Sequence, residues 1–85
     1  MEILLHKDFG KRYKKLTPSQ KKKFKERRDL FLQDQFNPVL NNHSLKGKYT
    51  GYRSINITGD LRVIYTEKGN KVIFVTVDSH SNLYG

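Results

Sequence analysis

The first half of the chain has the hydrophobic spacing of a short strand followed by two helices. Three consecutive apolar residues at positions 3–5 predict an opening strand over Glu2–His6. Phe9, Tyr13 and Leu16 then follow at intervals of four and three residues, which places them on one face of a helix. Basic residues occupy the other faces, so we expect this helix to rest on a core with its polar side in water.

A second helix begins with a strong local signal at Thr17. The Thr17 hydroxyl can cap the helix, Pro18 suits its first turn, and Gln20 stands where a capping box needs a glutamine. The helix is predicted to run to about Gln35 and to turn three apolar residues inward: Phe24, Leu30 and Phe31. Since the connection to the preceding helix is very short, the two should form a helical hairpin.

The second half of the chain has the pattern of short strands. Residues 37–51 contain Asn, Ser, Pro and Gly with isolated apolar residues, which indicates an ordered loop. Three strands are then predicted, separated by short turns: Tyr52–Ile57, Leu61–Thr66 and Lys71–Val77. Connections this short force antiparallel neighbours. Residues 72–75 are apolar without alternation, which predicts that the last strand is central and covered on both faces.

These elements predict an α+β fold in a single domain over residues 1–85. An N-terminal strand and a helical hairpin pack on a twisted antiparallel sheet of about four strands. A chain of 85 residues can bury only one thin core, so an active site must be a shallow groove.

Composition removes several classes of protein. No apolar run approaches the roughly 20 residues that a membrane helix needs, and the N-terminus lacks the apolar core of a signal peptide. We therefore expect no membrane span, and because the apolar face of the second predicted helix is needed for the core, we expect no membrane partner either. The absence of cysteine excludes disulfides, thiolate zinc sites and a cysteine nucleophile, and it fits a cytoplasmic protein.

Charge narrows the choice of partners. The formal net charge is +9, which favours a polyanion: nucleic acid, an anionic membrane or an acidic protein. The densest basic segment lies on the second predicted helix, where Lys21, Lys22, Lys23 and Lys25 could bind phosphates. The alternative interpretation of this segment is a solvated helix face beside a buried Phe24.

Two histidines stand in predicted loops at the ends of strands, where groups that transfer protons are often placed. His43 lies before the first strand of the sheet and His80 follows the last one. With Arg53 and Arg62 on neighbouring strands, they supply what a metal-free ribonuclease needs: proton carriers and cations that stabilise the phosphorane. Either histidine alone could equally be an ordinary surface residue. Carboxylates after residue 36 are too few for a two-metal site, so we expect neither metal nor cofactor.

Tyrosines are also numerous, and aromatic rings can stack on unpaired bases. Tyr49, Tyr52 and Tyr84 are candidates for this role. Tyr65 stands inside an apolar strand and is expected in the core.

Several of these residues fall in an ordered series of motifs. LKG at 45–47, GYR at 51–53, GDLRVIY at 59–65 and DSHSNLYG at 78–85 together resemble the RelE/ParE superfamily of toxin–antitoxin toxins, in particular its YafQ-like branch. The first half of the chain matches in layout only. The resemblance implies a RelE-like fold and an endoribonuclease that cuts mRNA, typically on the ribosome. It also implies a cognate acidic antitoxin that silences the enzyme.

The resemblance implies roles for five residues. His43 stands before LKG, where this branch has a catalytic histidine, and Asp60 matches an acid at the start of a strand. Arg62 matches the arginine that acts on the scissile phosphate. His80 and Tyr84 match the histidine and the terminal aromatic of the C-terminal motif.

Two further basic residues, Lys46 and Arg53, join the lysines of the second helix as expected RNA-binding residues. One departure stands out, because the branch often carries an acid and a histidine at the positions of Ser54 and Asn56. Fewer titratable groups are therefore available here. Two other functions stay open: a ParE-like toxin that inhibits gyrase, and a non-catalytic protein that binds RNA or the ribosome. An ion pair of Arg62 with Asp60 or Asp78 is the structural alternative to its catalytic role.

Overall fold

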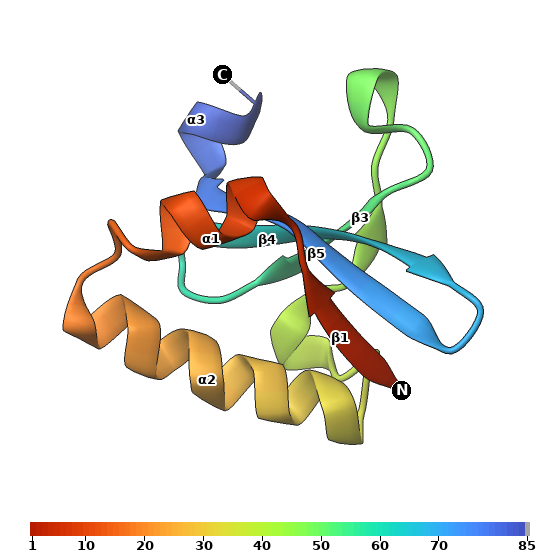
Figure 1. The fold of residues 1–85 in the computed structure, drawn as a ribbon, viewed down its shortest axis with the longest axis horizontal. Helices are drawn as coiled ribbons and strands as arrows, with labels where there is room; N and C mark the ends of the chain where they lie inside the picture. Colours follow the sequence, from red (N-terminus) through yellow and green to blue (C-terminus); the bar gives the residue numbers. More distant parts are fainter. Residues whose placement is uncertain (85) are drawn as a thin grey trace.

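The computed structural model describes residues 1–84, which form one five-stranded mixed sheet with two helices on one face and a short third helix (Figure 1). The strands are β1 (Glu2–Leu5), β2 (His43–Ser44), β3 (Arg53–Asn56), β4 (Leu61–Lys68) and β5 (Lys71–Ser79). The α-helices are α1 (Lys7–Tyr13), α2 (Pro18–Gln33) and α3 (His80–Tyr84), and two 3-10 turns are η1 (Pro38–Leu40) and η2 (Gly47–Tyr49). None of the helices among these residues has the length and apolar character needed to cross a bilayer.

Local signals decide where the two long helices begin. The capping box of α2 is confirmed: the amide of Gln20 donates to the Thr17 hydroxyl at 3.1 Å, and the Gln20 side chain accepts from the Thr17 amide at 2.9 Å. His6 caps α1 by accepting from the Asp8 amide at 3.0 Å, so it ends the strand rather than belonging to it. Leu16 lies beyond the end of α1 but still packs against the core.

The sheet differs from the predicted one in two respects. Its strand order is β1-β5-β4-β3-β2, and β1 pairs with β5 in parallel, with Glu2 opposite Lys71. No short turn joins these two strands, so nothing imposes the antiparallel direction that the other three pairs adopt. The fifth strand, His43–Ser44, lies inside the predicted loop and is only two residues long. The prediction of about four antiparallel strands is therefore corrected to five mixed strands.

One face of the sheet carries the main core. Phe9 of α1 and two phenylalanines of α2 pack on Phe74, with ring centroids 5.8–6.0 Å from it. Tyr65 is fully buried in the same cluster, as expected, and its ring lies 5.1 Å from Phe31. These tilted and edge-to-face contacts are the geometries that aromatic rings prefer. The helices α1 and α2 thus form one layer, which packs on the aromatic face of the sheet.

The other face of the sheet has no long helix on it. β5 is central, between β1 and β4, as predicted, but the expectation that it is covered on both faces is met only in part. Ile73 and Val75 are only half-buried. The run of apolar residues at 72–75 reflects the central position of β5 together with a bulge. The bulge follows from the register between β4 and β5, which shifts at Ile64/Tyr65.

The C-terminal segment folds back instead of trailing away. After β5, residues 80–84 form α3, an element that the sequence pattern did not predict, and Leu83 is buried. α3 and the loop that carries η2 both project on the side of the sheet away from α2 (Figure 1). The fold therefore gathers the C-terminal motif and the segment around residues 43–52 on one side.

Candidate active site

Cross-strand register defines the face on which the predicted residues meet. Directly opposed residues share a face of a sheet, and His43 opposes Ser54 while Ser54 opposes Ile64. In the next row Arg62 stands between Asn56 and Asp78. This face is the one opposite the aromatic core, because the alternate residues of β4 belong to the core cluster.

His43 has a defined tautomer. Its Nδ1 lies 2.8 Å from the carbonyl oxygen of Asn41, and because a carbonyl can only accept, Nδ1 must carry the hydrogen. In the neutral ring Nε2 is then the unprotonated nitrogen, which is the form a general base needs. The side chain is exposed, so a substrate can reach it.

The turn at 58–60 ties the start of α3 to the sheet. The His80 amide donates to the carbonyl of Asp60 at 2.8 Å, and the Thr58 hydroxyl accepts from the amides of Asp60 and Leu61 at 3.3 and 3.0 Å. These bonds fix the backbone of His80 and leave its exposed imidazole free of structural duties. The Asp60 carboxylate is also exposed.

Tyr84 is held by two aromatic neighbours. The centroid of its ring lies 4.8 Å from that of the His80 imidazole and 6.2 Å from that of Tyr49, which meets it edge-on. Lys48 places its ammonium 5.2 Å from the Tyr49 centroid. The ring of Tyr84 remains 38% exposed, so it can stack on a base. Tyr49 was expected only as one of several stacking candidates, and its contact with α3 depends on a helix that the sequence did not predict.

Arg62 makes no ion pair among residues 1–84. One terminal nitrogen, Nη1, donates to the carbonyls of Thr58 and Leu61 at 3.0 and 3.3 Å. The structural alternative of a pair with Asp60 or Asp78 is therefore not observed. The guanidinium is oriented by backbone carbonyls, and Asp78, which stands opposite it in β5, pairs with Arg12 instead.

Comparison with known proteins identifies the family of the chain. The whole chain, residues 1–85, matches the family model described as bacterial toxin of type II toxin-antitoxin system, YafQ. The chain belongs to the YafQ family of toxins. No curated protein sequence matches it.

Solved structures show that the YafQ-family fold is shared over nearly the full chain. Escherichia coli YafQ has 23% identity and a TM-score of 0.78, covering 99% of this chain and 98% of that one. The E. coli DinJ–YafQ complex gives 22% and 0.76, with coverage of 99% and 98%. A YoeB/ParE toxin from Agrobacterium tumefaciens gives 20% and 0.77, with coverage of 94% and 99%. The predicted resemblance to YafQ-like toxins is confirmed by the family model.

Other expected RNA-binding residues of this YafQ-family chain lie apart from the histidines. Lys21, Lys22, Lys23 and Lys25 are on α2, across the sheet from α3. Lys21 stands over the Tyr13 ring at 5.5 Å and Lys23 pairs with Glu26 at 3.4 Å. Lys46 is exposed directly before η2. The α2 lysines thus belong to a second basic surface, away from the predicted proton carriers.

Arg53 is not placed beside Arg62. It opposes Tyr65 and shares the face of the aromatic core, whereas Arg62 points to the other face. The hypothesis that the two guanidiniums together contact one phosphate is therefore not supported by their placement. Strand alternation carried this signal, since Arg53 and the apolar Ile55 are two residues apart.

Ser54 and Asn56, the two positions that depart from the branch pattern, lie on the same face of the sheet as His43 and Arg62. Ser54 is fully buried, and within residues 1–84 neither its hydroxyl nor the Asn56 side-chain oxygen has a hydrogen-bond partner. Neither side chain can take a proton near neutral pH. β3 therefore supplies no group that could transfer a proton near neutral pH. No group of three or more His, Cys, Asp or Glu side chains suited to a metal ion occurs within residues 1–84.

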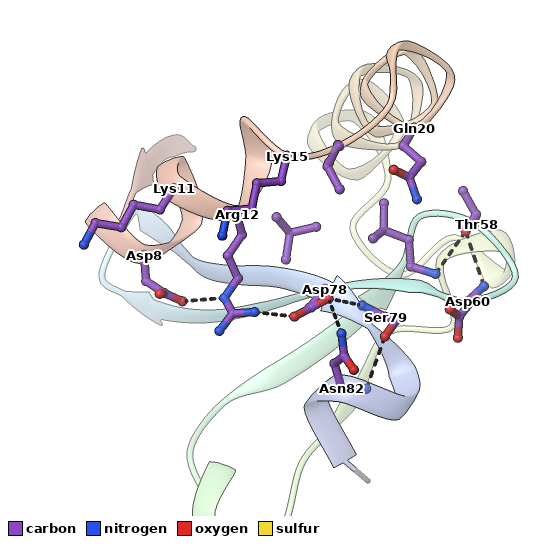
Figure 2. Close-up of a pocket in the computed structure, with 13 residues that line it drawn as sticks. Asp8, Lys11, Arg12, Lys15, Gln20, Thr58, Asp60, Asp78, Ser79 and Asn82 are labelled. Atoms are coloured by element: carbon purple, nitrogen blue, oxygen red, sulfur yellow. Dashed lines mark hydrogen bonds and ion pairs between the residues drawn. The ribbon is translucent and has the colours of Figure 1, made fainter.

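Asp78 anchors the end of β5 to α1. Its carboxylate pairs with Arg12 and accepts from the Ser79 amide at 2.8 Å and from the Asn82 side chain at 3.1 Å (Figure 2). Burial raises the pKa of Asp78, but these hydrogen bonds and the Arg12 charge outweigh burial and lower the pKa below its ordinary value of 3.8.

The anchor at Asp78 lies in a groove of about 540 Å³ between α1 and the turn at 58–60, with Asp60 at its far end (Figure 2). Arg12 also lies 3.4 Å from Asp8, so it bridges two carboxylates. These contacts hold α1 against the segment that leads into α3.

This anchor predicts a loss of stability in acid. Since the folded protein holds Asp78 ionised, its contribution is complete above the ordinary pKa and disappears as pH falls through the lowered one. We expect the melting temperature to fall more steeply between pH 5 and about 2.5 for the wild type than for Asp78→Asn, which has no charge to lose. If the melting temperatures of the two proteins fall in parallel as the pH is lowered, the ion pair of Asp78 contributes nothing to stability.

Proposed function

We propose that this toxin is a metal-independent endoribonuclease that cleaves mRNA on the ribosome, in the cytoplasm. The observation that carries the proposal is the contact of Tyr84 with Tyr49. This contact brings the C-terminal histidine and its aromatic neighbour to the side of the sheet where His43 and Arg62 lie. One side of the sheet then offers two proton carriers, an unpaired guanidinium and a stacking surface.

In this proposal His43 is the base. Its bare Nε2 can take the proton of a ribose 2′-hydroxyl as the 2′-oxygen attacks the adjacent phosphorus. His80, in its protonated form, donates to the 5′-oxygen as the bond between phosphorus and that oxygen breaks. The products are a 2′,3′-cyclic phosphate and a 5′-hydroxyl. Each proton taken from the nucleophile is matched by one given to the leaving group, so the step needs no cofactor.

Arg62 and Tyr84 supply the remaining functions. The free donors of Arg62 can bind the non-bridging phosphate oxygens, where negative charge grows in the transition state. Tyr84 can hold a base by stacking, which orients the ribose in front of His43. Asp60 stands at the start of the same strand as Arg62 and its backbone holds His80 in place.

Charge and family support two further partners. The basic surface of α2, which lies away from the histidines, suits ribosomal RNA, because lysine–phosphate contacts need no particular sequence. E. coli YafQ forms a complex with the antitoxin DinJ. We propose that an acidic antitoxin likewise neutralises this chain, whose formal net charge is +9.

The proposal is tested by incubating the purified protein with mRNA and translating ribosomes, with and without EDTA, and mapping the new 5′ ends. We expect cleavage that needs ribosomes, survives EDTA and leaves 5′-hydroxyl ends. The double variant His43→Ala/His80→Ala controls for contaminating nucleases. If the wild type leaves mRNA intact in this assay, the proposal is wrong, and inhibition of DNA gyrase would then point to the ParE-like alternative.

A further inference from the structure

His43 lies in a segment that has little regular structure to hold it. β2 is two residues long and sits at the edge of the sheet, and both of its side chains are exposed. Asn41, whose carbonyl fixes the His43 tautomer, has a positive φ of 46°. After glycine, asparagine is among the residues that adopt this conformation most readily. The turn is therefore allowed, and its exact position depends on contacts made by neighbouring residues.

The residue between Asn41 and His43 supplies them. The Asn42 side-chain oxygen accepts from Nε of Arg53 at 2.8 Å. Its amide nitrogen donates to the Tyr65 hydroxyl at 2.7 Å and to the carbonyl of Gln35 at 3.1 Å. The orientation of the amide is unambiguous, because Arg53 can only donate and a backbone carbonyl can only accept. Asn42 therefore joins the end of α2, β3 and β4 at one point.

Both ends of this network lie against aromatic rings. Tyr65 is fully buried, and its ring is packed against those of Phe31 and Phe74. Arg53 lies with its guanidinium 5.3 Å from the ring centroid of Phe36, a position that stacking favours. Gln35 adds a second bond to the Tyr65 hydroxyl at 3.2 Å. A half-buried polar network with this many satisfied groups fixes one arrangement of its members.

We propose that Arg53 and Asn42 are positioning residues for His43, an inference that rests on the proposed function of His43 as the base. Arg53 and Tyr65 act from the aromatic face of the sheet. They hold the Asn42 amide, which fixes the backbone of the 41–43 segment and so keeps the Asn41 carbonyl on Nδ1 of His43. The unprotonated nitrogen then faces the substrate. Arg53, expected from the sequence to bind RNA, is assigned here to the support of the base.

Two measurements test this assignment. In long-range ¹H–¹⁵N spectra at a pH where histidines are neutral, the wild type should show His43 protonated at Nδ1, and Asn42→Ala and Arg53→Ala should show a mixture of tautomers. In single-turnover cleavage on saturating ribosomes, the same variants should be roughly 10- to 100-fold slower, as expected for a misplaced catalytic group. Ribosome binding should stay close to that of the wild type.

Matched variants separate positioning from general damage. Asn70→Ala removes an amide from an exposed turn and should change neither the His43 tautomer nor the cleavage rate. Arg53→Lys keeps the charge but loses the Nε donor, and Tyr65→Phe removes only the hydroxyl; both should shift the tautomer, and they replace the alanine variants if those fail to fold. An unchanged tautomer, or a wild-type cleavage rate in the folded variants, overturns the proposal. If the wild type itself does not cleave RNA, the tautomer measurement alone decides the positioning role.

Discussion

Replacing His80 with alanine is expected to abolish growth arrest and to slow cleavage by roughly 10²- to 10⁴-fold, the usual contribution of a group that transfers a proton. Its imidazole is exposed and touches only the Tyr84 ring among the aromatic contacts, whereas its structural bond to Asp60 is made by the backbone amide. That amide survives the substitution. The free energy of unfolding should therefore change by no more than about 0.5 kcal/mol.

His6→Ala provides the opposite control. His6 is exposed as well, but its ring caps α1, and losing a cap costs about 1 kcal/mol of stability. We expect a lower melting temperature with normal cleavage for His6→Ala, and a normal melting temperature with lost cleavage for His80→Ala. A folded His80→Ala protein that still arrests growth would show that His80 does not donate the proton.

Arg62→Lys should cleave roughly 10- to 1000-fold more slowly, in line with the loss of one oriented donor in the transition state. The arginine uses Nη1 on the carbonyls of Thr58 and Leu61, and in the proposed mechanism its other donors bind a phosphate. A lysine ammonium has a single centre, so it cannot hold the carbonyl and present a planar pair of donors at once. Charge is preserved, and ribosome binding should remain nearly unchanged.

Single-turnover cleavage on saturating ribosomes measures how Arg62→Lys changes the rate of cleavage itself, without the contribution of binding. Arg62→Gln, which also loses the charge, should be slower still. If Arg62→Lys cuts at the wild-type rate, the arginine only braces the turn at Thr58, and the phosphorane must be stabilised by another group.

Features encoded by neighbouring residues were predictable from the sequence. The capping box at Thr17 and the β4–β5 hairpin depend on contacts within a few positions, and both are confirmed. The parallel partner of β1 and the short helix α3 were not predictable, because each depends on packing against distant segments. β2 was not predictable either, because a strand of two residues carries no periodic pattern.

In the candidate site, too, local motifs were readable from the sequence and contacts between distant segments were not. Motifs indicated His43, Arg62 and His80, and the structure puts them on one side of the sheet. The support of His43 by Asn42 was invisible in sequence, because its partners come from three different elements. Arg53 was assigned to RNA although its spacing from Ile55 already placed it on the core face. An isolated arginine in a polar-looking motif says little until the alternation of its strand is taken into account.

The parallel pairing of β1 bears on the order in which the chain can fold as it is made. Glu2 is made well before its partner strand, which begins only at Lys71. The β4–β5 hairpin closes over a tight connection, whereas β1 must wait for residue 71 and then close a very long loop. Because β5 leads directly into His80, β1 can join the sheet only when the segment just before His80 is made. A nascent chain that stops before β5 therefore lacks both the pairing of β1 and the histidine that we propose as the proton donor.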